Sequence, residues 1–173
     1  MKSDVIEELF LRYYNDALLY VLSLTKNKAQ AEDVVSAAFY KALRGKDEEI
    51  KNFKSWLMKV CRNVWFDAHR RRKREVKLTD NIIDESESAI EKIIKGESHK
   101  ALYKAIDLLP EAQKEVVILF YFEELRIKDV TKIVGKSEDS VKVLLYRARE
   151  NLKTILDLWR FWCSTCSKLC LED

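Results

Sequence analysis

The chain has 173 residues, 47% hydrophobic and 35% charged, so it can bury one modest core or two small ones. Three Gly and one Pro leave little turn chemistry for a many-stranded sheet, which excludes most β architectures and favours helices. A formal net charge of +3 is too small to indicate a nucleic-acid partner by itself, so that inference depends on where the charges lie. We predict an all-α protein made of two small helical domains.

The sequence predicts no membrane insertion. No uninterrupted apolar run is long enough to span a bilayer. The N-terminal stretch MKSDVIEELF carries acids where a secretory signal would need an apolar core. We therefore expect a cytoplasmic protein.

Apolar residues recur at helical spacing in three successive segments of the first half. The third segment runs directly into five consecutive cations, Arg70 to Arg74, just after the aromatic pair Trp65 and Phe66. Dense positive charge beside flat rings is the combination that grips single-stranded nucleic acid. The predicted helices are Ile6 to Leu24, Ala31 to Ala42 and Phe53 to Arg74.

An acidic stretch separates the two halves. Between Thr79 and Glu97 six acids face only two cations, Lys92 and Lys95. Such a composition predicts a solvated, flexible linker. A second interpretation is that the stretch mimics nucleic acid and lies along a basic channel of a partner.

The second half is predicted to contain a helix-turn-helix. It begins near Ser98, and Pro110 fits the first turn of a helix from Glu111 to Phe122. Two further helices flank Gly135, which can take the left-handed conformation of the turn, and Ser137 can cap the second of them. The small core of this unit is predicted to contain Val130, Ile133, Val134, Val141 and Leu145.

Positive charge is concentrated in this unit. From Arg126 to Lys153, eight cations oppose four acids. The second helix would present Lys142, Tyr146, Arg147 and Arg149 on its exposed face, and a DNA major groove is wide enough to admit a helix. The pattern therefore predicts DNA binding.

Four segments, in order and on both sides of the acidic stretch, carry a resemblance to a known family. They are AEDVVSAAFYKAL (Ala31 to Leu43), FKSWLMKVCRNVWFDAHRRRKR (Phe53 to Arg74), LLPEAQKEVVILFYFEEL (Leu108 to Leu125) and SVKVLLYRARENL (Ser140 to Leu152). Together they resemble the extracytoplasmic-function (ECF) group of bacterial sigma factors, of the sigma-70 family. That group has only the second and fourth sigma domains.

The resemblance implies four parts of the chain and a function in transcription initiation. The protein would bind the largest-subunit clamp and the flap of core RNA polymerase. It would direct the polymerase to promoters and assist strand opening. An anti-sigma factor is a further implied partner. The parts would be sigma domain 2 (residues 1–76), the acidic linker (77–97), sigma domain 4 (98–157) and a cysteine-containing tail (158–173).

The resemblance implies a loop, Arg44 to Asn52, that would help to capture a flipped base. It also implies three sets of binding residues. Minus-ten DNA would be contacted by Lys59, Arg62, Asn63, Asp67, Arg70, Arg71 and Arg72; minus-thirty-five DNA by Lys136, Ser140, Lys142, Val143, Tyr146 and Arg147; and core polymerase by Glu32, Asp33, Ser36 and Lys41.

Some of these residues, and the aromatic residues near them, have a structural alternative. Aromatics at helical spacing are more often core than base platforms, and we favour core for Trp56 and Trp65. The cations from Arg70 to Arg74 could instead be a solvated helix end, although we favour DNA binding. Glu32 and Asp33 also suit the first turn of a helix.

The recognition helix departs from the usual family pattern at two apolar residues. Val143 and Leu144 stand where a small residue and an Arg are usual. Apolar side chains can contact thymine methyls but cannot read guanine, so we expect an altered minus-thirty-five preference. Both side chains could instead pack against the preceding helices, and for Leu144 we favour that interpretation.

The tail contains Cys163, Cys166 and Cys170, whose spacing places three thiols on one face of a helix. Thiolates favour zinc or copper(I), but a closed tetrahedral zinc site would need a fourth ligand. We favour packing or a partner-binding face, with a metal or redox sensor as the alternative, and expect no required cofactor.

The sequence shows no catalytic constellation around His69 or His99 and no phosphate-binding glycine loop, so we predict that the protein is not an enzyme. Two other classes of function remain: a helix-turn-helix regulator that does not dock on polymerase, and a metal- or redox-responsive DNA-binding protein.

Overall fold

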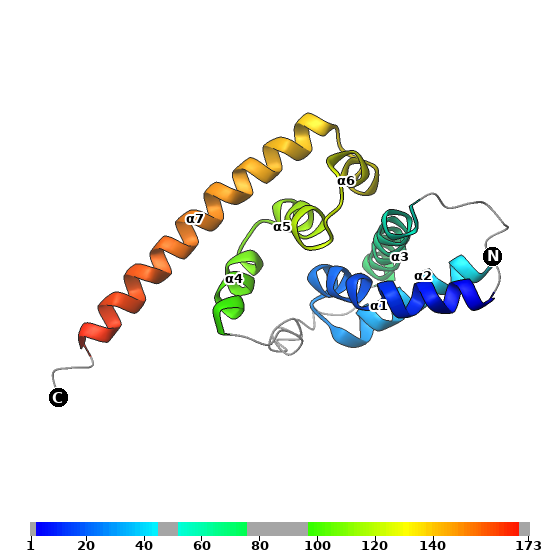
Figure 1. Cartoon of the computed structure of the whole chain (residues 1–173), viewed down its shortest axis with the longest axis horizontal. Coiled ribbons are helices and arrows are strands. Elements are labelled where there is room, and N and C mark those ends of the chain that lie inside the picture. The colour runs from blue at the N-terminus through cyan, green and yellow to red at the C-terminus, as the bar shows by residue number, and fades with distance from the viewer. Residues whose placement is uncertain (1–2, 45–51, 76–96, 170–173) are drawn as a thin grey trace.

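The computed structural model describes residues 3–44, 52–75 and 97–169, which form helices joined by turns, with no strand in these ranges. This confirms the all-α prediction. Figure 1 shows the first three helices on one side of the molecule and the remaining helices on the other, with the last helix extending well beyond the rest. The helices are α1 (Ser3–Thr25), α2 (Lys28–Arg44), α3 (Phe53–Glu75), α4 (Glu97–Asp107), α5 (Glu111–Val117), η2 (Ile118–Phe122), α6 (Ile127–Val134) and α7 (Glu138–Leu169).

Two asparagines fix where α2 and α3 begin. The Oδ1 atom of Asn27 accepts a hydrogen bond from the Gln30 backbone N–H at 3.0 Å. Asn52 does the same for the Ser55 N–H at 3.2 Å. Each side chain thereby satisfies a backbone donor that has no acceptor within its helix.

The predicted helix from Glu111 to Phe122 forms over these residues, but only its first part, as far as Val117, is α-helical. Pro110 precedes the helix as an extended N-cap residue instead of lying within its first turn. From Ile118 the chain forms a π-helical turn, in which the Glu123 N–H donates to the Ile118 carbonyl at 2.9 Å. Apolar spacing cannot distinguish this wider turn from an α-helix, because both bury the same few side chains.

The first half has a well-filled core. The apolar stripe of the second predicted helix is buried in α2, where six of its side chains face inward. Trp56 and Trp65 are half-buried and pack against this core, which confirms the core interpretation of both. The six residues of α2 are Ala31, Val34, Val35, Ala38, Phe39 and Ala42.

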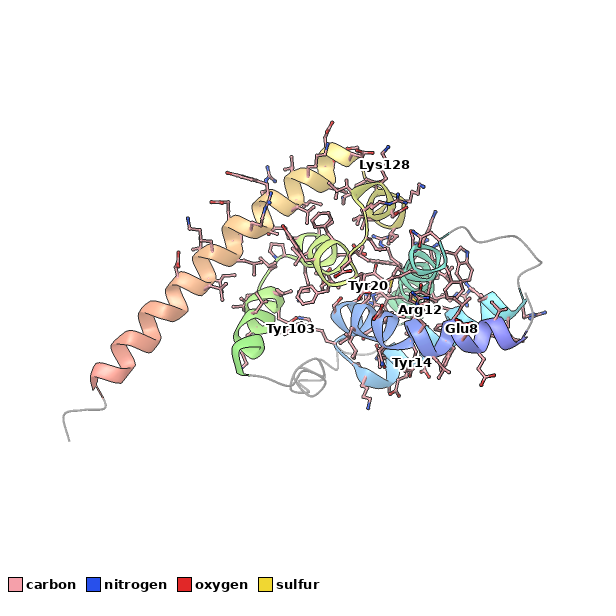
Figure 2. The ribbon with its side chains drawn as sticks, viewed as in Figure 1. Glu8, Arg12, Tyr14, Tyr20, Tyr103 and Lys128 are labelled. Atoms are coloured by element: carbon pink, nitrogen blue, oxygen red, sulfur yellow. The ribbon has the colours of Figure 1, made fainter. Side chains whose placement is uncertain are left out.

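The two halves pack against each other. The buried apolar residues of both form one continuous cluster, in which α3 contacts α6 and α1 contacts α5. Figure 2 places Tyr20 of α1 between the halves, whereas Lys128 lies at the outer side of α6. The predicted linker (77–97) lies outside the described residues except for its last residue, Glu97, the first of α4. The sequence gives no indication of this direct contact, because it joins residues far apart in the chain.

Within the described residues, none of the helices has both the length and the apolar character needed to cross a bilayer.

Candidate nucleic-acid interface

The helix-turn-helix forms as predicted. Gly135 ends α6 in the left-handed conformation, with φ of 70°. The Ser137 hydroxyl accepts a hydrogen bond from the Ser140 backbone N–H at 3.2 Å and caps α7. The five predicted core residues of the unit are all buried. The turn and its small core therefore hold α7 at a defined angle to α6, with one face of α7 left open.

The open face of α7 carries the residues predicted to contact minus-thirty-five DNA. Val143 is 46% exposed and Tyr146 is 60% exposed, and Lys142 and Arg147 are also exposed. Leu144 is half-buried against the core, as expected for a packing residue. This face thus combines two cations with two large apolar or aromatic side chains, while Lys136 and Ser140 are exposed at its beginning.

A second exposed face lies along α3. Lys59, Asn63, Asp67 and Arg70 are exposed and follow one another at spacings of three and four, which aligns them along the helix. Arg71 is exposed beside them, and Arg70 lies 3.8 Å from the Asp67 carboxylate. The side chain of Arg72 lies outside the described residues. This face is polar and mainly positive, as nucleic-acid backbone binding requires.

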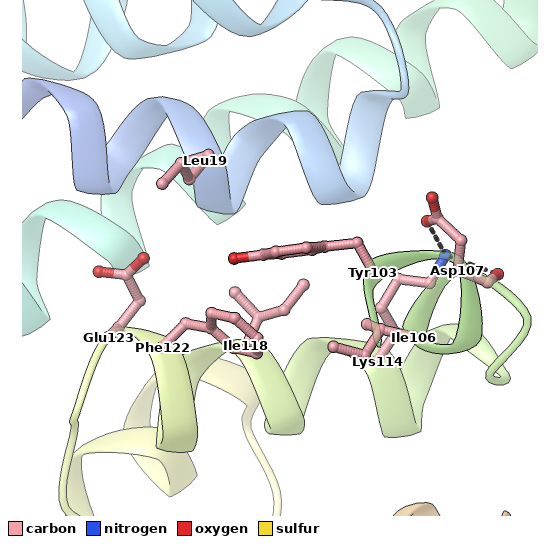
Figure 3. Close-up of a pocket in the computed structure, with 8 residues that line it drawn as sticks. All are labelled: Leu19, Tyr103, Ile106, Asp107, Lys114, Ile118, Phe122 and Glu123. Carbon is pink, nitrogen blue, oxygen red and sulfur yellow. Dashed lines mark hydrogen bonds and ion pairs between the residues drawn. The ribbon is translucent and has the colours of Figure 1, made fainter. Parts of the chain in front are cut away.

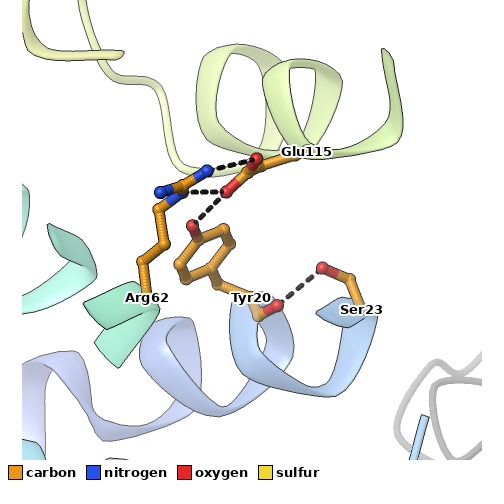
Figure 4. Close-up of polar contacts among 4 residues, drawn as sticks. All are labelled: Tyr20, Ser23, Arg62 and Glu115. Carbon is orange, nitrogen blue, oxygen red and sulfur yellow. Dashed lines mark hydrogen bonds and ion pairs between the residues drawn. The ribbon is translucent and has the colours of Figure 1, made fainter. Parts of the chain in front are cut away.

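Arg62, from the same predicted set, lies in a different environment. Its Nε donates to Glu115 Oε1 at 2.7 Å and its Nη2 to Glu115 Oε2 at 3.5 Å. The Tyr20 hydroxyl donates to the same Oε1 atom at 2.9 Å. Figure 4 shows α1, α3 and α5 each contributing one side chain to this cluster. The guanidinium also lies 4.5 Å from the centre of the Phe66 ring, so Arg62 contacts both an anion and an aromatic ring.

A second ionic cluster crosses between the halves. Lys54 of α3 lies 2.8 Å from Asp16 and 3.0 Å from Glu123, which follows η2. Burial raises the pKa of Glu123 to about 7, although the Lys54 ammonium acts in the opposite direction. Burial by itself would lower the pKa of Lys54, but its bonds to the two carboxylates outweigh that effect and raise it.

Glu123 also lines a small apolar cavity between the halves. The cavity measures about 30 Å³, and Figure 3 shows Leu19 of α1 on one side with Tyr103, Ile118 and Phe122 on the other. Burial, and then the nearby Glu123 carboxylate, raise the pKa of Tyr103. The low-dielectric surroundings of Glu123 therefore come from both halves of the molecule.

The predicted polymerase-docking residues lie on α2. Asp33, Ser36 and Lys41 are exposed, whereas Glu32 is half-buried and lies 3.7 Å from Lys28. Tyr40, beside them, is also exposed. The surface therefore mixes charges with an exposed aromatic ring, which suits a protein partner.

The cysteines are described only in part. Cys61 is fully buried, and burial raises the pKa of its thiol to about 12. Cys163 and Cys166 lie on α7, but their side chains, like the whole of Cys170, lie outside the described residues. Among the side chains that are described, no three His, Cys, Asp or Glu groups come together as a metal site.

Comparison with known proteins identifies the family. Residues 9–75 match Sigma-70 region 2, and residues 99–152 match Sigma-70, region 4. The ECF RNA polymerase sigma factor SigM of Bacillus subtilis is 31% identical over 87% of this chain and 94% of its own length. The chain belongs to the ECF group of the sigma-70 family.

Further relatives agree with this assignment. The RNA polymerase sigma factor SigV of Bacillus subtilis is 33% identical to this sigma factor over 79% of each chain. The solved structure of the sigma factor RpoE from Bartonella quintana, in complex with the anti-sigma factor NepR, superposes with a TM-score of 0.73. It is 27% identical and covers 87% of this chain and 96% of its own.

Proposed function

We propose that this ECF sigma factor binds core RNA polymerase and directs it to promoters, with α3 contacting the minus-ten element and α7 the minus-thirty-five element. The observation that carries the proposal is the pair of exposed basic faces, one on each half of the molecule. The α3 face is built around Lys59, Asn63 and Arg70, and the α7 face around Lys142 and Arg147. Two separate DNA-binding faces suit a protein that reads two promoter elements at once.

The two faces suit different forms of DNA. The helix-turn-helix presents α7 as a rigid rod that fits a duplex major groove. The α3 face continues towards the cation-rich end of its helix, which suits the backbone of an opened strand. We therefore propose that α3 holds the separated minus-ten strand and so assists opening.

The chemistry of the α7 face favours a particular class of minus-thirty-five sequence. Val143 is exposed, and a branched apolar side chain can contact a thymine methyl but cannot donate to guanine. Arg147 lies one helical turn after Val143 and carries a positive charge. We propose that the minus-thirty-five element has a thymine opposite Val143. Arg147 would donate hydrogen bonds either to a guanine edge or to a phosphate.

Core polymerase would dock on α2 through Glu32, Asp33, Ser36 and Lys41, with its flap contacting the second half. The solved structure of the RpoE relative contains the anti-sigma factor NepR, and we propose that an anti-sigma factor also controls this chain. The protein would act in the cytoplasm, where polymerase and DNA meet. Sigma factors act by binding and not by catalysis, so we propose no reaction and no required cofactor.

The decisive experiment is a pull-down of purified core RNA polymerase in the absence of DNA, followed by run-off transcription across genomic fragments. We expect a stable complex and initiation at a defined set of promoters. A helix-turn-helix regulator without polymerase docking would bind DNA fragments and leave core enzyme unbound. Failure both to bind core enzyme and to initiate transcription would overturn the proposal.

A further inference from the structure

The last helix continues an apolar stripe beyond the domain that it helps to form. The first part of this stripe packs in the core, where α4, α5 and α6 contact α7. Figure 1 shows the last turns of α7 projecting away from every other described helix. Along the whole helix the spacing of the stripe alternates between four and three residues. Its positions are Val141, Leu145, Ala148, Leu152, Ile155, Trp159, Trp162, Cys166 and Leu169.

A strict seven-residue repeat of apolar positions is the pattern by which one helix packs along another. Between Val141 and Leu152 the stripe packs on helices of the same chain. From Ile155 to Leu169 the repeat continues, but no other described helix lies beside it. The opposite side of this projecting part carries Asp157 and Lys168. The projecting part of α7 is therefore an amphipathic helix whose apolar side has no covering helix within the described residues.

A groove opens at the base of the projecting helix. It measures about 190 Å³ and lies where the turn between α4 and α5 meets α7. Leu108 of that turn is 63% exposed, and Ile155 of the stripe also lines the groove. Each molecule thus carries an apolar helix end and, at the base of the same helix, a groove that such an end fits. The lining residues are Leu108, Leu109, Pro110, Asn151, Thr154 and Ile155.

We propose that the projecting part of α7, from Ile155 to Leu169, binds the same part of a second copy of this chain in an antiparallel pair of helices. A two-fold axis near Trp162 places the two stripes against each other and brings the end of each helix to the groove of the other copy. In a parallel pair the two domains would collide, because α4, α5 and α6 lie on the striped side of α7. This dimer is independent of promoter recognition.

The stripe is large enough for a stable dimer. The segment from Ile155 to Leu169 is about 21 Å long. The two copies together contribute four tryptophans, which would bury about 600–1,000 Å², since an aromatic side chain buries roughly 150–250 Å². Ile155, Leu169 and the Leu108 groove would take the total above the ~1,000 Å² that a specific interface needs. Tryptophans at the centre of an interface also contribute most of its affinity.

The test measures the mass of the full-length protein by sedimentation equilibrium. A reductant and a chelator are present, so that neither disulfides nor metal ions join two chains. We expect a monomer–dimer equilibrium in the wild type. Trp162→Glu places a charge within the stripe and should raise the dimer Kd by about 10-fold or more. Phe161→Glu adds the same charge one position earlier, outside the stripe, and should match the wild type.

A second pair of variants tests the groove without altering α7. Leu108→Glu changes a largely exposed side chain, so the fold should tolerate it, and we expect it to raise the dimer Kd as well. Leu11→Glu changes a leucine of α1, in the other half of the molecule, that is 74% exposed. It should dimerise like the wild type. Circular dichroism checks that every variant keeps its helices.

The outcomes decide both the dimer and its geometry. A wild type that stays monomeric at about 100 µM, where even a weak specific pair is occupied, would overturn the proposal. Binding of that monomer to phosphatidylglycerol vesicles, lost in Trp162→Glu, would assign the stripe to a membrane surface instead. A dimer that forms equally in Trp162→Glu and Leu108→Glu would have its interface elsewhere, which also contradicts the proposal.

Small-angle X-ray scattering tests the orientation. The antiparallel pair places the centres of the two DNA-binding domains about 50 Å apart along the joined helices. We expect an elongated dimer whose distance distribution shows this second maximum. A compact dimer with the domains in contact would overturn the antiparallel arrangement.

Discussion

Arg147 and Val143 lie four residues apart on the exposed face of α7, and in the proposed complex they would contact DNA by different chemistry. An arginine can donate two hydrogen bonds to a guanine edge or one to any phosphate, whereas valine can only contact methyl groups. The geometry of α7 is compatible with both roles of Arg147. The identity of the atoms that it contacts therefore decides how specific this sigma factor is.

We predict that Arg147→Ala weakens binding of the holoenzyme to its own minus-thirty-five element by about 1–3 kcal/mol. The loss should be much smaller on a promoter whose minus-thirty-five element is scrambled, because a base contact is absent there. Quantitative footprinting on both promoters measures the difference. An equal loss on the two promoters would identify Arg147 as a phosphate contact.

Cys61 should be chemically inert in the folded protein. Its thiol is fully buried, and its pKa of about 12 leaves almost no thiolate, which is the reactive form. We predict that iodoacetamide at pH 8 leaves Cys61 unmodified until the protein is unfolded in urea. Mass spectrometry of tryptic peptides locates the modification, and labelling of native Cys61 at the rate of the urea-unfolded chain would contradict the prediction.

Residue roles that depend on helical spacing could be predicted from the sequence, and those that depend on distant contacts could not. The packing of Trp56, Trp65 and Leu144 follows from an apolar stripe with a period near 3.6. The pairing of Arg62 with Glu115 joins residues 53 positions apart, and the Tyr20 bond to Glu115 spans 95. Periodicity carries no signal for such contacts, so it does not distinguish Arg62 from its exposed neighbours on the same helix.

At the scale of elements, the sequence predicted the helices better than their ends and internal irregularities. Apolar stripes located α1, α2 and α3, and Gly135 with Ser137 located the turn between α6 and α7. The caps at Asn27 and Asn52 were missed, although an Asn just before an apolar stripe is a recognisable signal. The π-helical turn η2 leaves no such signal in the sequence.

The turn before α7 offers a test of backbone conformation alone. A Cβ atom built on Gly135 meets no atom within 4 Å, so any cost of substitution comes from its φ of 70°. We predict that Gly135→Ala lowers the free energy of unfolding by about 1–2 kcal/mol, as expected for an L-residue in the left-handed region. Urea unfolding followed by circular dichroism measures this change.

The matched variant is Gly135→Asn, because asparagine tolerates the left-handed conformation better than alanine does. It should lose less stability than Gly135→Ala despite its larger side chain. If the two variants are equally destabilised, side-chain volume and not backbone strain governs this turn.

At the scale of the whole molecule, the two halves are connected by charges that change with pH. Glu123 carries the titratable group at the centre of this contact. It faces Lys54 from α3, Asp16 from α1 and the Tyr103 hydroxyl end from α4. Opening the molecule would return Glu123 to water, where a glutamate has a pKa near 4.5.

The direction of the pH effect follows from the raised pKa. While the halves are packed together, Glu123 keeps its proton up to about pH 7, whereas in halves that have come apart it would lose the proton near pH 4.5. Between these values the packed arrangement binds more protons, so lowering the pH favours contact between the halves. This contribution is fully present below pH 4.5 and is lost as the pH rises through 7, and its size is about 3 kcal/mol.

We therefore predict that the radius of gyration of the free sigma factor increases between pH 5.5 and pH 8. Glu123→Gln mimics the protonated side chain, so it should stay compact across this range, whereas Glu124→Gln, at the exposed neighbouring position, should follow the wild type. Scattering at several pH values measures the change, and circular dichroism separates opening from unfolding. A wild-type profile that stays constant with pH, or a Glu123→Gln profile that still expands at pH 8, would show that Glu123 does not control the contact between the halves.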